Sequence, residues 1–374
     1  MKVGIISHTE HYTSSEGTIV GWGPTVKELN KLLEIADSIV HIAPLHKESA
    51  PKSALSYTSN KIKFVPLKPS GGKGFSKLSI LLIAPYNLVQ IHKALKDVDY
   101  VQFRAPTGIG IYILPFLKFF SRKKYWVKYA GNWIDKNMPL GNKFQKFWLQ
   151  KFTSINTKVT VNGFWKNERL NIIPFENPCL DHDDRNLGDE IVKKKKLSNK
   201  ITYCFVGALN THKGVDIILD VFSRLETDKI EAIHFVGDGE EKEKYIELSK
   251  KVKYKTFFHG FLSKDSIREI YFKSHFIILP SKSEGFPKVI AEAMNYGCIP
   301  IVSNISCIDQ YVKNEENGFL LEFPTSTHLE KEIKKSLRLT PKQYFKWTQY
   351  NYVLTKKFTY SYYNSMLKTK IFKG

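Results

Sequence analysis

Two glutamates, Glu284 and Glu292, stand with seven residues between them directly after an apolar run, Phe276 to Leu279. The run predicts a buried strand, and the polar residues 280–285 predict a tight loop. Pro287 suits the first turn of a helix, because its fixed φ is helical and its missing N–H would have no partner there. The spacing therefore places Glu284 at the start of a helix and Glu292 in the body of that helix.

The start of a helix offers unpaired N–H groups and a partial positive charge, which suit a phosphate. A carboxylate in the same loop suits sugar hydroxyls instead, because it accepts hydrogen bonds. Phosphate donors beside hydroxyl acceptors are what a nucleotide-sugar requires. The alternative is that Glu284 only caps the helix and Glu292 is a solvated surface residue. For two carboxylates alone, this alternative is the more common case.

A longer pattern surrounds the two glutamates. It consists of Pro280-Ser281, Glu284-Gly285-Phe286-Pro287, Glu292-Ala293-Met294, Gly297-Cys298-Ile299-Pro300-Ile301-Val302 and Asn317-Gly318-Phe319-Leu320. This pattern resembles the retaining glycosyltransferases of family 4, the glycosyl transferases group 1 family. The resemblance implies that Glu284 contacts the transferred sugar and that Glu292 holds the ribose hydroxyls. It also places Gly285, Phe286 and Pro287 in the donor-binding loop, with the backbone N–H at Gly285 turned to a diphosphate.

A second match follows the predicted strand at residues 201–207. Gly207 and the pair Lys213-Gly214 stand where the family carries Gly-Arg and Lys-Gly to grip the diphosphate. The arginine is absent, because Ala208 occupies its position. The resemblance implies that Lys213 is catalytic, by stabilising the departing diphosphate, and that Gly207 binds the donor. The alternative for Lys213 is a solvated loop lysine.

Two further glycines follow the first predicted strand, Lys2 to Ser7. Gly21 and Gly23 precede a helical apolar pattern. Strand, glycine loop and helix is the phosphate-cradling arrangement of α/β nucleotide folds, and the same order occurs in the family, so both glycines are donor-binding candidates. Two glycines on their own more often only make a turn.

The ends of two other predicted strands depart from the family. Many relatives carry a histidine there, whereas this chain has Arg104 at one end and Asn132 at the other. Both residues are therefore candidates for contacts to the acceptor or to the leaving phosphate. A surface ion pair is the alternative for Arg104.

Strands alternate with helices in both halves, which predicts parallel sheets covered by helices on both faces. We expect an α/β protein of the GT-B fold, with two Rossmann-like domains facing an interdomain cleft. The expected boundaries are an acceptor-side domain over 1–180, a polar linker over 181–200, a donor-binding domain over 201–355, and a C-terminal helix over 356–374 that returns to the first domain. Within the linker, we expect the Asp181-His182-Asp183 sequence and the lysine run 193–196 to be solvated.

The chain carries 57 Lys and Arg against 36 Asp and Glu, a net charge of +21, which implies an acidic partner. Two aromatic and basic stretches, 111–124 and 143–152, could rest on an anionic membrane, although packing on the sheet is the commoner use of such faces. The longest apolar runs, 81–91 and 108–117, are shorter than a membrane span requires. The four cysteines form no pair motif and suit a reducing compartment. We expect a cytoplasmic protein, peripheral on the inner membrane face.

These features together predict an enzyme that transfers a sugar, with retention, from a nucleoside diphosphate donor to a glycan or lipid-linked acceptor in surface polysaccharide assembly. The resemblance implies front-face substitution, in which the leaving phosphate takes the acceptor proton. We expect no cofactor beyond the nucleotide-sugar co-substrate, no metal and no nucleic-acid partner. One alternative is a nucleotide-sugar 2-epimerase of the same architecture. Another is a basic membrane-binding or nucleic-acid-binding protein with an inactive cleft.

Overall fold

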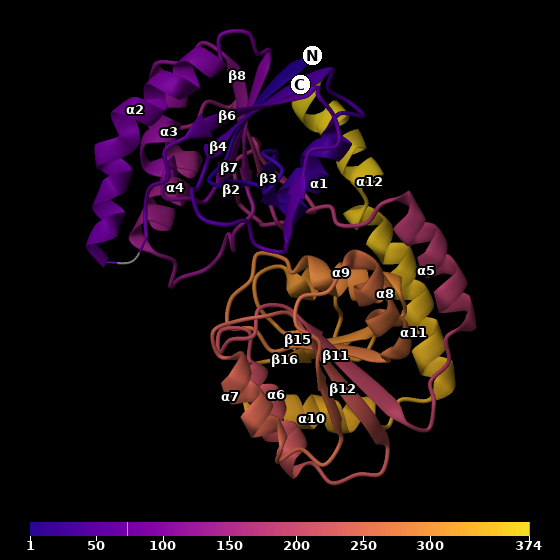
Figure 1. Cartoon of the computed structure of the whole chain (residues 1–374). Coiled ribbons are helices and arrows are strands. Elements are labelled where there is room, and N and C mark those ends of the chain that lie inside the picture. The colour runs from indigo at the N-terminus through magenta and orange to yellow at the C-terminus, as the bar shows by residue number, and fades with distance from the viewer. Residues whose placement is uncertain (73, 374) are drawn as a thin grey trace. The chain divides into compact units, whose positions relative to one another are not determined.

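The computed structural model describes residues 1–72 and 74–373, so Lys73 and Gly374, the end of the predicted C-terminal segment, lie outside the described residues. The chain divides into two compact units (Figure 1). The first unit comprises Met1–Asn177 and Tyr360–Gly374, and the second comprises Pro178–Thr359.

Over the described residues, the first unit is built on a seven-stranded parallel sheet in the order β10-β9-β8-β7-β1-β4-β6. Its strands are β1 (Lys2–Ile6), β4 (Ser38–Pro44), β6 (Ile62–Leu67), β7 (Tyr100–Ala105), β8 (Lys124–Tyr129), β9 (Lys158–Val161) and β10 (Ile172–Pro174). A small antiparallel sheet, in the order β2-β3-β5, is made of β2 (His11–Thr13), β3 (Ile19–Trp22) and β5 (Ala54–Ser56). The central strands β1 and β4 are almost fully buried because helices cover both faces of the sheet, whereas the edge strand β6 is partly exposed.

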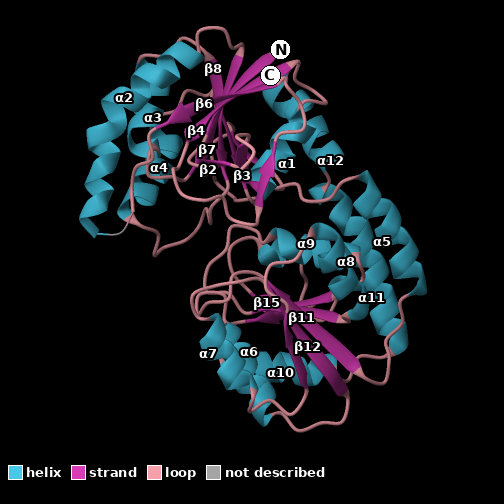
Figure 2. Ribbon diagram, in the orientation of Figure 1, coloured by secondary structure: helices cyan, strands magenta, loops and turns pink. Residues whose placement is uncertain are grey.

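Helices cover the two faces of this sheet separately (Figure 2). One face carries α2 (Ser79–Ala94), α3 (Gly110–Phe119) and α4 (Leu140–Lys151), and the short 3₁₀ turn Gly74–Leu78 leads into α2. The other face carries α1 (Gly23–Leu32), α12 (Tyr360–Met366) and the π-helical end Leu367–Phe372. Tyr363, Leu367 and Ile371 are buried in the core on this second face, so residues 360–373 pack as part of the first unit.

The second unit, over its described residues, contains a six-stranded parallel sheet in the order β13-β12-β11-β14-β15-β16. Its strands are β11 (Ile201–Val206), β12 (Ile230–Val236), β13 (Lys255–Phe258), β14 (Phe276–Leu279), β15 (Ile299–Ser303) and β16 (Phe319–Leu321). One face is covered by α6 (Val215–Arg224), α7 (Lys242–Ser249) and α10 (Ser326–Ser336), and the other by α5 (His182–Lys194), α8 (Lys264–Lys273), α9 (Lys288–Asn295) and α11 (Pro341–Leu354) (Figure 2). Two 3₁₀ turns, Ile308–Gln310 and Thr355–Phe358, complete the unit.

The segment 181–200, expected to be a solvated linker, instead contains α5. Asp181 is the N-cap of this helix and forms a capping box with Asp184, so it is not a free carboxylate. Lys195, from the lysine run expected to face solvent, is 8% exposed, and its Nζ donates to the carbonyl oxygens of Tyr271 and Tyr296 at 2.7 and 2.9 Å. Burial lowers the pKa of this lysine.

The length of the helix around α2 also differs from the expectation. Residues 74–94 form a continuous helical stretch of 21 residues, and its most apolar 18-residue window has mean hydropathy 1.2, so the stretch is long and apolar enough to cross a membrane by those two measures. The run 81–91 is shorter than a membrane span on its own, and residues 74–80 and 92–94 lengthen the helix on either side of it. Length and composition alone do not separate a spanning helix from a core helix.

A buried acid, Asp184, ties α5 to α8 and α9. Its Oδ1 accepts from Arg268 at 2.7 Å and from the Tyr296 hydroxyl at 2.7 Å, and its Oδ2 accepts from Lys264 at 2.5 Å. The side chain is 1% exposed. Burial opposes ionisation, but hydrogen bonds from the Asp181 backbone and Lys264 prevail and hold the pKa of Asp184 well below its usual range. The carboxylate is therefore ionised and fully paired.

Replacing Asp184 by Asn should destabilise the protein by about 3 kcal/mol or more, because it leaves two cations around a neutral buried group. Asp265 supplies a matched control, since it pairs with the same Arg268 but is 85% exposed. Urea unfolding of D184N and D265N measures the difference. Equal unfolding midpoints for both variants would contradict a structural role for the buried acid.

A chain of hydrogen bonds with a single direction lies beside the carboxyl ends of β1 and β4. His11 Nδ1 donates to the Thr9 carbonyl at 2.8 Å, so the neutral ring accepts at Nε2 from the Tyr57 hydroxyl at 2.8 Å. Tyr57 must then accept from His41 Nδ1 at 2.6 Å, and His41 Nε2 accepts from the Ser7 hydroxyl at 2.8 Å. Burial lowers the pKa of His11 to about 4 and that of His41 well below 6.5, so both rings stay neutral.

The depressed histidine pKa values predict acid destabilisation with a defined sign. Unfolded histidines bind protons near pH 6.5, whereas native His11 resists protonation until about pH 4. Stability from His11 is therefore present above pH 6.5 and is lost as pH falls towards 4. The urea midpoint of H11N should fall less steeply between pH 7 and pH 5 than that of the unmodified chain. The control is H182N, at an 86% exposed side chain; identical slopes for H11N and the unmodified chain would refute the prediction.

Candidate functional site

The second sheet changes direction at the boundary between β11 and β14. These two strands are neighbours, but the chain continues from β11 to β12 and β13 on one side and from β14 to β15 and β16 on the other. The loops that follow β11 and β14 therefore diverge over opposite faces of the sheet. Ligands of open α/β sheets bind at the carboxyl ends of the strands at such a point. Lys213 lies in the loop after β11, and Glu284 lies in the loop after β14.

The two loops are held against each other by their backbones. The Lys282 N–H donates to the His212 carbonyl at 3.0 Å. Gly214 has φ +76°, and a Cβ at this position would lie 2.5 Å from the Pro280 carbonyl oxygen, so only glycine fits. The Lys213 N–H donates to Asn210 Oδ1 at 3.0 Å. These contacts fix where the Lys213 side chain starts.

Lys213 and Glu284 form a direct ion pair, in which Lys213 Nζ donates to Glu284 Oε1. The side chains are 25% and 12% exposed, so their charges are partly shielded from water and attract more strongly than a surface pair. The sequence predicted that both residues contact one donor, Lys213 at the diphosphate and Glu284 at the sugar. The structure brings these two residues, from different motifs, into contact.

Two helices begin beside this pair without a capping side chain. The N-cap residues are Gly214 for α6 and Pro287 for α9, and neither provides a side-chain hydrogen bond. By contrast, α5, α8, α10 and α11 begin at capping side chains, which are Asp181, Ser263, Thr325 and Thr340. No side chain caps the first-turn N–H groups of α6 and α9, although the Ile290 N–H donates to the Pro287 carbonyl at 3.1 Å. Such helix starts suit an anion, and Lys213 adds a full positive charge.

Sequence reasoning missed two hydroxyls near the same strand ends. Ser281, after β14, and Ser303, at the end of β15, are each 1% exposed, and their Oγ atoms have no hydrogen-bond partner among the described residues. Asp216, in the first turn of α6, likewise has an unpartnered Oδ1. Buried polar atoms cost free energy unless water or a ligand completes them. Among these residues, the family pattern pointed only to Ser281, through the Pro280-Ser281 dipeptide.

Glu292 lies on α9, in the helix body as expected. Its side chain is half-buried, and its Oε2 accepts from the Tyr271 hydroxyl of α8 at 3.4 Å. Burial and the Glu292 charge raise the pKa of Tyr271 well above 10, so the hydroxyl keeps its proton and remains a donor. The contact places Glu292 beside α8, whereas Glu284 faces Lys213.

The remaining donor-loop candidates are placed by their backbone and by packing. The Gly285 carbonyl accepts from the Ser306 hydroxyl at 2.7 Å. Phe286 is 7% exposed and stacks on Phe358 with 4.6 Å between ring centroids, so its side chain belongs to the core. Pro287 is the N-cap of α9, one position before the expected first turn. Gly207 follows β11 directly, and its N–H donates to the Val236 carbonyl at 3.0 Å.

Gly21 and Gly23 do not form the expected glycine loop. Gly21 lies within β3, where a Cβ would come 2.4 Å from His11 Nε2, so its small size makes room for the histidine of the hydrogen-bonded chain. Gly23 is the first residue of α1, and its N–H donates to the Ser53 carbonyl at 3.2 Å. Packing explains the glycine at both positions, and the local pattern could not show these distant neighbours.

Arg104 belongs to a buried ion cluster and is not a surface residue. Its Nη1 donates to Glu28 Oε1 at 3.1 Å, and Lys128 Nζ donates to the same oxygen at 2.6 Å. Glu28 and Lys128 are 4% and 3% exposed. The Tyr363 hydroxyl also donates to Glu28, at 3.4 Å, so the cluster joins α1, β7, β8 and α12. Arg104 therefore forms an ion pair, as the alternative predicted, but the pair lies inside the first unit and not on its surface.

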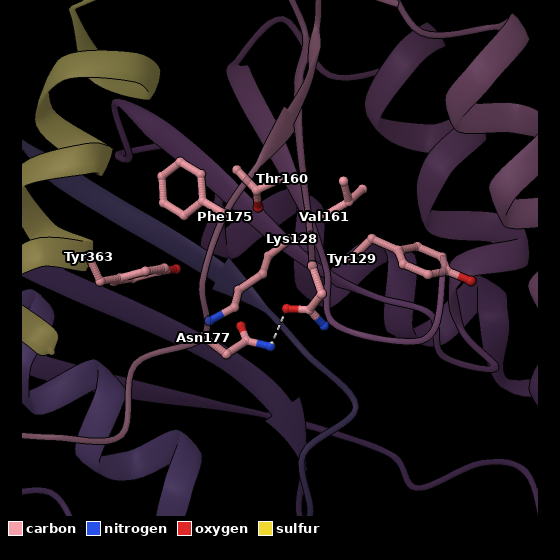
Figure 3. Close-up of a pocket in the computed structure, with 8 residues that line it drawn as sticks. Lys128, Tyr129, Thr160, Val161, Phe175, Asn177 and Tyr363 are labelled. Atoms are coloured by element: carbon pink, nitrogen blue, oxygen red, sulfur yellow. Dashed lines mark hydrogen bonds between the residues drawn. The ribbon is translucent and has the colours of Figure 1, made fainter. Parts of the chain in front are cut away.

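Asn132 lies in the loop after β8, where its Oδ1 accepts from the Ile134 N–H at 3.1 Å. Near this strand end is a shallow hollow, too narrow to hold a water molecule, that is lined by Lys128, Tyr129, Thr160, Val161, Asn162, Phe175, Asn177 and Tyr363. Figure 3 shows Lys128, Asn177 and Tyr363 converging on it, and Asn177 Nδ2 donates to Asn162 Oδ1 at 2.9 Å.

Over residues 1–72 and 74–373, no group of three or more His, Cys, Asp or Glu side chains is arranged to hold a metal ion.

Comparison with known sequences finds similarity to glycosyltransferases, mainly in the second unit. Residues 188–353 match the family described as glycosyl transferases group 1. An uncharacterized glycosyltransferase from Haemophilus influenzae is 34% identical over 204 residues, which cover 54% of this chain and 50% of that protein. The match thus spans half the length of that relative. The family match lies within the second unit and covers less than half of the chain.

Comparison with solved structures confirms the fold. Sucrose-phosphate synthase from Thermosynechococcus elongatus has a TM-score of 0.73 and 13% identity, with coverage of 100% of this chain and 98% of that one. HepE from Anabaena, solved in complex with UDP, has a TM-score of 0.72 and 13% identity, with full coverage of both chains. These similarities, together with the two parallel sheets, confirm the predicted α/β, GT-B fold.

The arrangement around Lys213 predicts opposite effects of neutralising its two partners. Pyrophosphate binding should weaken about tenfold to a hundredfold in K213M, because a charged hydrogen bond is lost. Binding should be unchanged or tighter in E284Q, because Lys213 is then free of its carboxylate. Isothermal titration with pyrophosphate measures both effects, and K282M, at an exposed lysine of the neighbouring loop, is the charge-matched control. Equal losses in K213M and K282M would exclude a specific role for Lys213.

Proposed function

We propose that this chain is a retaining glycosyltransferase of family 4. Its second unit matches the glycosyl transferases group 1 family, and its fold is GT-B. Its donor is a nucleoside diphosphate sugar. The observation that carries the proposal is the Lys213–Glu284 ion pair at the carboxyl ends of β11 and β14, beside the uncapped starts of α6 and α9. The UDP complex of HepE supports a nucleotide donor for this fold.

In the proposed complex, the diphosphate takes the place of Glu284 at Lys213. The positive ends of α6 and α9 add N–H donors, which compensates for the missing arginine at Ala208. Glu284, released from the lysine, accepts hydrogen bonds from the sugar hydroxyls. Glu292 accepts from the ribose hydroxyls and is oriented by Tyr271. In the ligand-free protein, the ion pair thus holds together Lys213, the proposed diphosphate ligand, and Glu284, the proposed sugar ligand.

The proposed reaction forms a bond between the acceptor oxygen and the anomeric carbon and breaks the bond from that carbon to the diphosphate. The acceptor approaches the same face that the diphosphate leaves, so the configuration is retained. The leaving phosphate oxygen takes the proton of the acceptor hydroxyl, so the proposal assigns no protein base. Lys213 and the helix starts balance the charge of the diphosphate, and the proposal includes no metal ion and no other cofactor.

The acceptor in this proposal is a glycan or lipid-linked precursor of a surface polysaccharide. The net charge of +21 favours a reaction at an anionic surface, and the proposed location is the cytoplasmic face of the inner membrane. Arg104 would act through Glu28 and Lys128, which lines the hollow beside β8, so its role towards the acceptor is to position Lys128.

A panel of nucleoside diphosphate sugars, followed by proton NMR of the anomeric position, tests the proposed activity. We expect one donor to transfer its sugar to an added glycan or lipid-linked acceptor with the donor's anomeric configuration. Without acceptor, only slow hydrolysis should occur, whereas a 2-epimerase would convert the sugar. Inversion of configuration, or donor binding without any transfer, would contradict the proposal.

Two matched substitutions separate donor binding from other roles. E292Q should lose most of its donor affinity or turnover, because ribose recognition needs the full acceptor strength of a carboxylate. E316Q is the control, since Glu316 is an exposed acid of the same unit. Normal kinetics in E292Q would remove the ribose role from Glu292.

A further inference from the structure

The helical stretch Gly74–Ala94 exposes an apolar face that the sequence analysis did not select. Its most apolar 18-residue window has mean hydropathy 1.2, yet only 22% of that window is buried. A core helix of this composition would be mostly buried. The exposed side chains recur at three-, four- and seven-residue spacing along one side of the helix and are Phe75, Leu78, Leu82, Tyr86 and Val89, with Leu81 beside them. Phe75 and Leu82 are 92% and 80% exposed. We call these six side chains the α2 face.

The opposite side of α2 is anchored in the first unit. Ala84, Asn87 and Ile91 are buried. The Asn87 side chain accepts from the Lys68 N–H at 3.0 Å and donates to the Lys68 carbonyl at 3.1 Å, which ties the middle of α2 to the end of β6. Crossing a bilayer would break these contacts and expose the core between α2 and the sheet. The anchored helix can therefore rest in a lipid interface but cannot span the membrane while the unit stays folded.

Positive charge surrounds the α2 face. The stretch Gly74–Ala94 contains no Asp or Glu and carries Lys77 and Lys93, both exposed. Lys68 Nζ lies 4.2 Å from the centroid of the Tyr86 ring. This pattern of apolar side chains with lysines at the edge is typical of helices that lie on anionic membranes.

The neighbouring helix α3 extends the same kind of surface. It packs against α2, and the two helices lie side by side in Figure 1. At its end, Phe119 and Phe120 are 63% and 73% exposed beside the exposed Lys118 and Arg122. By contrast, the centre of α3, within the stretch expected to touch a membrane, is buried in the core.

We propose that the α2 face docks on an anionic lipid bilayer, with its apolar side chains in the interface and its lysines at the headgroups. A second copy of this chain fits the surface less well, because symmetric pairing of the α2 face would bring Lys77 and Lys93 towards like charges. Each lysine near an anionic surface adds attraction that falls off within a Debye length. This proposal rests on the first unit alone and does not depend on the chemistry of Lys213 and Glu284.

Vesicle co-sedimentation of the full chain tests the proposal. The unmodified chain should bind vesicles of phosphatidylglycerol and phosphatidylcholine at low salt, bind vesicles of phosphatidylcholine alone weakly, and be released towards ~1 M salt, where the Debye length is ~3 Å. The F75S/L82S variant should lose at least about tenfold in partitioning onto the anionic vesicles. L170S/V353S is the matched control, because Leu170 and Val353 are 90% and 69% exposed outside the α2 face.

A second variant guards against misfolding of the first. K77E/K93E changes only exposed charges and should also weaken binding to anionic vesicles, with unchanged thermal unfolding and pyrophosphate affinity. The proposal is overturned if the unmodified chain ignores anionic vesicles, or if both α2-face variants bind them as the control does. A dimer that dissociates in F75S/L82S, without vesicle binding, would assign the face to a second copy of the chain.

Discussion

The ion pair between Lys213 and Glu284 organises the edge of the second sheet at which β11 and β14 end. It joins the loops after β11 and β14, the two strands from which the chain diverges over opposite faces of the sheet. Each side chain is largely shielded from water, so each charge needs a partner. In the proposed donor complex, a diphosphate binds the lysine and sugar hydroxyls bind the glutamate, so two new contacts replace the ion pair. Under this proposal, a single ion pair in the ligand-free protein joins the two groups that recognise the donor.

Much of this edge could be predicted from the sequence because its elements are local. The apolar run at β14, the polar loop after it and the start of α9 near Pro287 follow from burial, loop chemistry and helix geometry. The contact between Lys213 and Glu284 could not be predicted in this way, since it crosses 71 residues and depends on β11 lying next to β14. Strand order is a property of the whole sheet, which no local pattern encodes.

The predictions that the structure changed share one physical cause, which is an unseen partner. Lys195 is buried because distant carbonyl oxygens satisfy its ammonium group, and Arg104 is internal because Glu28 reaches it from α1. Gly21 is small because His11 occupies the space of its missing side chain. The α2 face is the opposite case, because its side chains are apolar but exposed to solvent. Composition predicted an anionic partner, but only the burial of each side chain shows which surface could meet it.

A crystal structure of the chain with a non-hydrolysable nucleoside diphosphate sugar tests the central claim most directly. We expect Lys213 Nζ within hydrogen-bonding distance of a diphosphate oxygen, and Glu284 turned from the lysine to a sugar hydroxyl. The diphosphate should lie against the first turns of α6 and α9. A donor bound with the Lys213–Glu284 pair intact and remote from its phosphates would contradict the claim.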